Sequence, residues 1–112
     1  MGMHRNEVKR LMEQEIWEFF NALDSIKIIA NHYGLEHQLR KCREELTELC
    51  VATIGYHIGE NNKEDIQRIV TEIADVEIMT AQLKYLLDIK EKVNKEKVYK
   101  INRQLKRMES EE

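Results

Sequence analysis

The absence of proline constrains this chain more than any other feature of its sequence. Its 112 residues include no proline and four glycines, so a helix that starts meets few residues able to stop it. Sheet sandwiches and barrels need many turn-forming residues and are poor candidates. The hydrophobic fraction of 42% suffices for one modest core, and the length suits one domain. We therefore predict a single all-α domain spanning residues 1–112.

Apolar residues recur at helical spacing in five segments, which predicts an antiparallel bundle of four to five helices. The expected helices run from about Asn6 to Leu23, Ile26 to His32, Leu35 to Ile54 and Lys63 to Leu87, and a last helix carries Val98, Ile101, Leu105 and Met108. Asp24 or Ser25 would begin the second helix, and Gly34 would end it. We expect a weak break at 88–94 and a frayed polar tail at 109–112.

Two of these helices carry apolar seams with the alternating spacing of bundle packing. The first seam comprises Leu35, Leu39, Cys42, Leu46, Leu49 and Thr53, and the second comprises Ile66, Ile69, Ile73, Val76, Thr80, Leu83 and Leu87. We expect the two helices to pack together along these seams. Between them, Asn62 with Asp65 resembles a capping box.

A lone bundle of this length buries limited surface, and the long apolar first helix needs a partner. We therefore expect a homodimer or a dimer of dimers. Trp17, Phe19 and Phe20 are expected in the core or at a subunit interface.

Cysteine usage and hydropathy are typical of a cytoplasmic protein. Cys42 and Cys50 lie eight residues apart, which matches neither a redox pair nor a zinc-binding spacing. One helix holds their sulfurs too far apart to bond, so we interpret both as reduced core thiols. No run approaches about 18 apolar residues, so no transmembrane helix is expected, and the N-terminus lacks the apolar region of a signal peptide.

Charge is unevenly distributed, although the net charge is only −3. Residues 13–77 hold fourteen acidic and six basic side chains, whereas residues 84–107 hold nine basic and three acidic side chains. This pattern indicates either a site that handles cations and anions together, such as a metal with phosphates, or solvated helix faces.

Two pairs of carboxylates stand at helical spacing. Glu45 and Glu48 are three residues apart, and so are Glu72 and Asp75. Both leading glutamates lie at the edge of a seam, so packing of the two helices would bring four carboxylates into one partly buried volume. Like charges at that range oppose folding, and a hard divalent cation, Mg²⁺ or Mn²⁺, would relieve the repulsion. Either pair alone is common on solvated helix faces. A di-iron site would require Glu-x-x-His motifs, and the sequence contains none.

The combined pattern EExxE followed by ExxD resembles the signature of MazG-like all-α nucleoside triphosphate pyrophosphohydrolases. It reads here Glu44-Glu45-x-x-Glu48 and then Glu72-x-x-Asp75, with 23 residues between the motifs. The residues around the second motif are similar to those of short single-domain, phage-type members. The resemblance covers about Ile28 to Arg107.

This resemblance implies Mg²⁺-dependent hydrolysis of a (deoxy)nucleoside triphosphate to the monophosphate and pyrophosphate. It assigns Glu45, Glu48, Glu72 and Asp75 as the metal ligands. It also assigns catalytic roles to Glu44 and Glu45, with Glu44 supporting the ligands or orienting water.

Four further residues are candidates for binding substrate. Gln38 and Lys41 lie two turns and one turn before Glu45 on the same side of the helix. Lys100 and Arg103 share a face of the last helix and could hold phosphates if that helix, or a neighbouring subunit, reaches the cluster. The alternatives are an ordinary ion pair for Lys41 and a solvated face for the other two.

Two other functions stay open at this point. The chain could be a non-catalytic helical interaction module whose acidic clusters are merely solvated. It could also bind nucleic acid through the basic stretch from Lys84 to Arg107, although the acidic middle of the chain argues against this.

Overall fold

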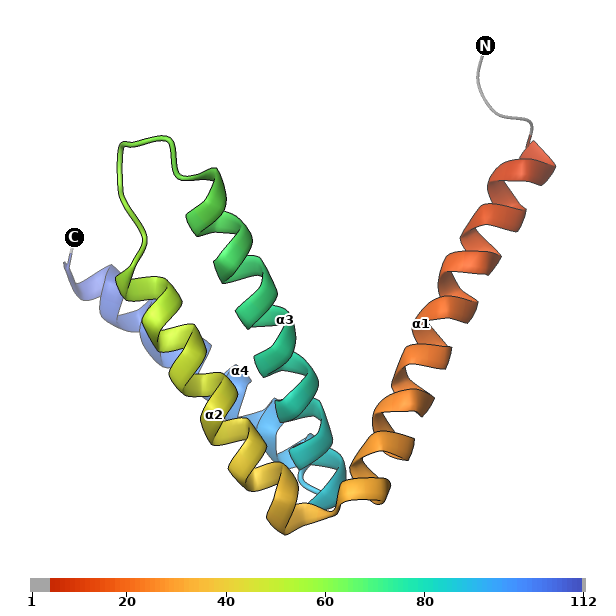
Figure 1. Cartoon of the computed structure of the whole chain (residues 1–112). Coiled ribbons are helices and arrows are strands. Elements are labelled where there is room, and N and C mark those ends of the chain that lie inside the picture. Colours follow the sequence, from red (N-terminus) through yellow and green to blue (C-terminus); the bar gives the residue numbers. More distant parts are fainter. Residues whose placement is uncertain (1–4, 112) are drawn as a thin grey trace.

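The computed structural model describes residues 5–111, apart from the side chains of residues 17, 19 and 20. The described residues form four helices and no strand. The helices are α1 (Arg5–Tyr33), α2 (Leu35–Ile54), α3 (Lys63–Leu86) and α4 (Lys90–Glu111) (Figure 1). The all-α prediction is confirmed. The predicted place of Trp17, Phe19 and Phe20 in a core or interface lies outside the described residues.

The first helix is continuous for 29 residues, where the sequence predicted two helices divided at Asp24 and Ser25. That division is wrong because Asp and Ser cost a helix interior less than about 0.7 kcal/mol each, and no glycine or proline stands nearby. The helix ends instead before Gly34, whose φ of 83° is a left-handed conformation that favours glycine. The Gly34 amide donates to the Ala30 carbonyl at 2.8 Å, which closes the helix.

α1 joins the other helices through its C-terminal turns alone. Among its described side chains, Ala30 is buried and Ile26 is half-buried, and the rest are exposed. The Asn31 amide donates to the Tyr85 hydroxyl on α3 at 2.8 Å, and the Lys27 ammonium lies 5.8 Å from the centre of the Tyr85 ring. Residues 5–23, here called the α1 arm, project away from the other helices (Figure 1).

α2 and α3 are antiparallel neighbours (Figure 1), and only part of each predicted seam is buried or half-buried. The buried residues of α2 are Gln38, Cys42, Glu45 and Ala52, and those of α3 are Met79 and Gln82. Leu39 and Leu46 of the predicted seam are 39% and 47% exposed. The seam prediction is therefore confirmed in part: Cys42 is buried and Leu49 is half-buried, but apolar periodicity locates a stripe on its own helix without identifying what every residue of that stripe contacts.

A tight turn at 87–89 redirects the chain after α3. Asp88 adopts a φ of 54°, the Asp88 amide donates to the Tyr85 carbonyl, and the Ile89 amide donates to the Lys84 carbonyl. This is the Schellman arrangement that ends many helices. It replaces the longer break predicted at 88–94, so α4 begins at Lys90 and continues to Glu111, through most of the expected tail. No residue of α4 is buried, and among the described helices it contacts α3 alone.

The two cysteines are both free thiols, and they differ in burial. Cys42 is buried as predicted, and burial raises the pKa of its thiol. Cys50 is exposed, so its assignment to the core is wrong: it lies on the side of α2 turned away from α3. No described helix has the length and apolarity needed to cross a membrane.

The loop between α2 and α3 is held by His57 and Asp65. Asp65 Oδ2 accepts a hydrogen bond from the His57 backbone N–H at 3.0 Å and lies 2.8 Å from His57 Nδ1. The predicted capping box is therefore wrong, because Asp65 reaches the loop and Asn62 makes no side-chain cap. These hydrogen bonds lower the pKa of Asp65.

We predict that Asp65→Asn lowers the melting temperature at pH 7. Because the pKa of Asp65 is lowered by folding, its contribution is present above 3.8, its ordinary pKa, and is lost as the pH falls through the folded-state value. The difference in melting temperature from wild type should therefore shrink as the pH falls below 3.8 and through the folded-state pKa, as measured by thermal melts across the pH range. The neighbouring Glu64→Gln is the control. An equal effect of both substitutions would contradict the role given to Asp65.

Candidate metal and nucleotide site

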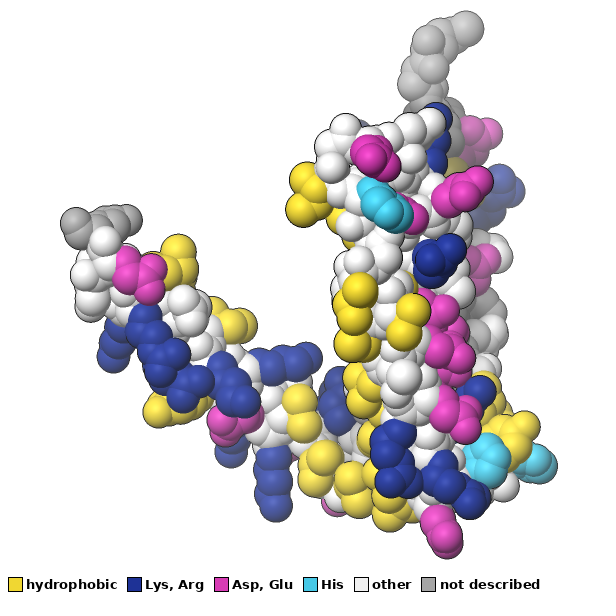
Figure 2. Space-filling view, turned by 60° about the vertical axis from the view of Figure 1, so that its left-hand side comes forward, with side chains coloured by type: hydrophobic (Ala, Val, Ile, Leu, Met, Phe, Trp, Pro, Cys, Tyr) yellow, Lys and Arg dark blue, Asp and Glu magenta, His cyan; other side chains and the backbone are white. Residues whose placement is uncertain are grey.

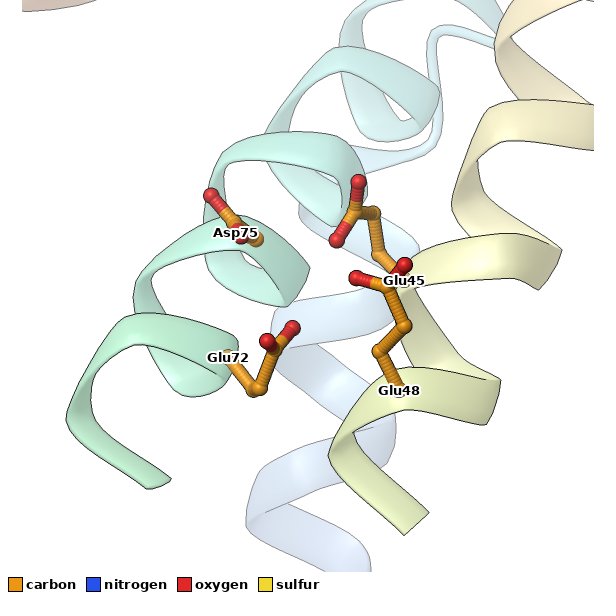
Figure 3. A group of neighbouring side chains, drawn as sticks. All are labelled: Glu45, Glu48, Glu72 and Asp75. Atoms are coloured by element: carbon orange, nitrogen blue, oxygen red, sulfur yellow. The ribbon is translucent and has the colours of Figure 1, made fainter. Parts of the chain in front are cut away.

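Four carboxylates from α2 and α3 converge in the space between the two helices. One carboxylate oxygen from each residue lies within 4.8 Å of the others. Figure 3 shows the two residues of α2 facing the two residues of α3. The four residues, here called the carboxylate cluster, are Glu45, Glu48, Glu72 and Asp75. The predicted convergence is confirmed, and Glu45 lies nearer the centre of the helix contact than the expected seam edge.

The cluster contains two buried oxygens that no hydrogen bond satisfies. These atoms are Glu45 Oε2 and Glu72 Oε2. Glu45 is only 8% exposed, whereas Glu72 and Asp75 are half-buried and Glu48 is exposed. A buried carboxylate oxygen without a donor is costly, and a cation or a hydrogen-bond donor placed between the two helices would offset that cost.

Burial raises the pKa of the Glu45 carboxyl, and the neighbouring Glu48 and Asp75 raise it further. A hydrogen bond from Lys41 opposes this shift. Lys41 Nζ lies 3.3 Å from Glu45 Oε1 and 3.6 Å from Glu44 Oε2, and these contacts raise the pKa of the ammonium. Lys41 thus links an exposed carboxylate to the buried one, and a single cation does not neutralise the whole cluster.

A buried pair of amides lies on the other side of Lys41. Gln38 and Gln82 are 3% and 2% exposed, and Gln38 Nε2 donates to Gln82 Oε1 at 2.6 Å. His37 Nδ1 lies 2.7 Å from Gln38 Oε1, which makes the ring nitrogen the donor because an amide oxygen only accepts. The Gln82 amino group donates to a methionine sulfur, Met79 Sδ, at 3.6 Å, and sulfur is a weak acceptor.

An open cavity of about 670 Å³ adjoins both the amide pair and the cluster. It is lined by Ile29, Tyr33, His37, Gln38, Arg40, Lys41, Glu44, Ile78, Met79 and Gln82. The Tyr33 and His37 rings stack within it at 4.7 Å and 18°. Aromatic faces, amides and cations therefore line one hollow next to four acidic groups.

Not all the predicted substrate residues come together. Gln38 and Lys41 line the cavity beside the cluster. Lys100 and Arg103 lie on α4, which contacts neither α1 nor α2 among the described helices, and Arg103 is 5.7 Å from the centre of the Tyr99 ring on the same helix. Lys100 and Arg103 were expected to hold phosphate if the last helix folded over the cluster. Within one chain, α4 does not fold over it.

Sequence reasoning missed Gln82. The residue lies two turns after Asp75 and therefore on the same side of α3 as the cluster. A polar residue on the buried side of a helix, beside the seam residue Leu83, was the available signal. Its partner Gln38 is 44 residues away, and no local pattern connects the two.

Comparison of the chain with protein-family models, with curated proteins and with solved structures finds no match in any of the three.

We predict that Glu45→Gln stabilises the metal-free protein at pH 7 by about 1 kcal/mol, because it removes a buried charge from among like charges. Folding raises the pKa of Glu45, so the cost is absent below 4.5, its ordinary pKa, and appears as the pH rises through the folded-state value. Chemical denaturation with chelator at pH 7 and at pH 4 measures both effects. The exposed Glu77→Gln is the matched control, and destabilisation by Glu45→Gln at pH 7 would contradict the prediction.

Proposed function

We propose that this protein is a Mg²⁺-dependent nucleotide pyrophosphohydrolase, which cleaves a (deoxy)nucleoside triphosphate to the monophosphate and pyrophosphate. The single observation that carries the proposal is the carboxylate cluster, with its two buried oxygens that lack a donor. The resemblance of EExxE and ExxD to the MazG-like motifs supports the same reaction.

The donor set fits a hard divalent cation. All four side chains offer carboxylate oxygens, the ligands that Mg²⁺ and Mn²⁺ prefer, and no described nitrogen or sulfur ligand stands among them. Glu45, Glu48, Glu72 and Asp75 would hold the ion. When bound, it supplies positive charge that offsets the polyphosphate and polarises the scissile phosphorus.

The other polar residues of the site divide between binding and proton transfer. Lys41 can exchange its contact with Glu44 for a phosphate oxygen, since it is half exposed and both partners lie beyond 3.2 Å. Glu44, exposed at the margin of the cluster, is then available to orient a water molecule and accept its proton. The water oxygen forms a bond to phosphorus, the phosphoanhydride bond breaks, and pyrophosphate leaves.

The neighbouring cavity suits the nucleoside. The stacked Tyr33 and His37 rings offer an aromatic face to a base. Gln82 offers an amide N–H whose present acceptor is weak, so a base carbonyl would satisfy it better. Gln38 positions Gln82 through their 2.6 Å hydrogen bond.

The alternatives make different predictions about cations. A non-catalytic interaction module with solvated acidic groups gains no stability from Mg²⁺. A nucleic-acid binder would use α4, where Lys and Arg gather on the face seen in Figure 2, and would be retained on DNA with steep salt dependence.

We predict that Mg²⁺ or Mn²⁺ raises the thermal stability of the wild-type protein. An ion that binds only the folded state adds about 2.7 kcal/mol at one hundred times its Kd. Glu72→Gln should abolish most of this gain, whereas Glu77→Gln should retain it. Melting curves recorded in chelator and in a metal titration measure the effect. No metal-dependent shift in the wild type would favour the interaction module.

We predict that wild-type protein releases pyrophosphate, and not orthophosphate, from at least one member of a panel of nucleoside triphosphates with Mg²⁺. Glu45→Gln and Glu72→Gln should lower that rate by about 100-fold or more, because each removes a metal ligand. Glu77→Gln is again the control. Metal binding without pyrophosphate release from any nucleotide, or unchanged rates in both variants, would refute the enzymatic proposal.

A further inference from the structure

A cavity bordered by α1, α3 and α4 lies apart from the carboxylate cluster. Its volume is about 330 Å³, and it shares no lining residue with the cluster or with the larger cavity beside the cluster. Its lining residues are Leu23, Ile26 and Lys27 of α1, Ala81, Lys84 and Tyr85 of α3, Asp88 of the following turn and Lys90 of α4. Three separate helices thus contribute one lysine each, and we call this hollow the lysine cavity.

Positive charge exceeds negative charge around the lysine cavity. Lys27, Lys84 and Lys90 contribute three ammonium groups and Asp88 contributes one carboxylate, which leaves an excess of two positive charges. Among the described side chains, none of the three lysines makes an ion pair, and the Lys27 ammonium lies 5.8 Å from the centre of the Tyr85 ring. Like charges gathered around one hollow repel each other, so an anion bound among them would offset that repulsion.

The beginning of α4 adds to this positive potential. Lys90, which lines the cavity, is the first residue of a helix of 22 residues. The first N–H groups of a helix have no acceptor within it, and the aligned peptide dipoles give this end a partial positive charge. An anion near Lys90 therefore meets the helix dipole and the ammonium groups together.

The remaining walls of the lysine cavity are apolar. Leu23 and Ile26 belong to the last turns of α1, Ala81 belongs to α3, and the Tyr85 ring completes the lining. The Tyr85 hydroxyl accepts a hydrogen bond from the Asn31 amide at 2.8 Å and donates one to its carbonyl oxygen at 3.1 Å, which holds the ring in place. A ligand that fills this cavity therefore needs both an anionic group and an apolar body.

We propose that the lysine cavity binds a small phosphate monoester that carries an apolar or aromatic body. A phosphate monoester has a charge of about −1.5 to −2 at pH 7, which matches the excess of two positive charges, whereas a carboxylate ligand would compensate only one of them. Lys84 and Lys90 hold the phosphate oxygens through charge-assisted hydrogen bonds. The body of the ligand lies against Leu23 and Ile26. This inference does not depend on the proposed enzymatic activity, which belongs to the carboxylate cluster.

The test is titration calorimetry of the full chain with phenyl phosphate, inorganic phosphate and phenol. Chelator keeps divalent cations out of the carboxylate cluster, so phosphate cannot bind there through a metal, and about 0.15 M salt screens weak surface attraction. Phenyl phosphate should bind at one site per chain and about tenfold more tightly than inorganic phosphate, because its ring is buried against apolar walls. Phenol should bind more weakly than phenyl phosphate. No binding of phenyl phosphate, or equal binding of phenol, would overturn the proposal.

Two matched double variants test the position of the site. Lys84→Gln with Lys90→Gln should lower the affinity for phenyl phosphate by about tenfold or more, because it removes two ammonium groups from the lining. Lys92→Gln with Lys95→Gln is the control: it removes the same charge from α4, and neither residue lines the cavity. An equal loss in both double variants would mean general attraction to the basic α4 and would overturn the proposal.

A substitution that keeps every charge tests the apolar part of the cavity. Ala81→Leu places a larger side chain in the lining and leaves the three lysines in place. It should weaken the binding of phenyl phosphate more than that of inorganic phosphate, since the body of the ligand loses its space. Unchanged affinity for phenyl phosphate would overturn the proposal. If the lysine variants lose their helical circular dichroism, this measurement decides the matter alone.

Discussion

Repulsion among four carboxylates between α2 and α3 is the constraint on which the structure depends. Glu45 is buried, Glu72 has a buried oxygen without a donor, and Lys41 compensates only part of the charge. Carboxylates at a helix contact oppose that contact through their mutual repulsion. A contact that sacrifices stability in this way is typical of functional sites, and it is the reason for proposing a metal there.

The same constraint explains why the core is so small. Where the helices meet, amides and carboxylates take positions that apolar residues hold in an ordinary bundle, and the buried hydrophobic residues are Ala30, Cys42, Ala52 and Met79 among those described. Many of the larger apolar residues are exposed instead, and others are half-buried. One choice of contact face thus leaves uncompensated negative charge inside the helix pair and apolar side chains exposed outside it.

The cavity and the cluster are neighbours because Lys41 lines the cavity and also contacts Glu45 of the cluster. On one side of Lys41 lie stacked rings and paired amides, and on the other lie the four carboxylates. This division separates a surface suited to a flat, neutral, hydrogen-bonding group from one suited to metal and phosphate. A nucleotide has both parts in one molecule, which is why the proposed function joins them.

The sequence by itself determined what depends on short-range geometry. It predicted the bounds of α2, the three-residue spacing of both carboxylate pairs and the convergence of the cluster, because helical periodicity relates residues within a few turns of each other. Sequence reasoning failed where the contacting residues are far apart in the chain and no short-range spacing relates them. The continuity of α1, the pairing of Gln38 with Gln82 and the course of α4 after Asp88 were decided by tertiary contacts and turn geometry. The contact face of α2 was decided in the same way, since periodicity gives the angle of a stripe about its own axis and only packing selects the face that another helix meets.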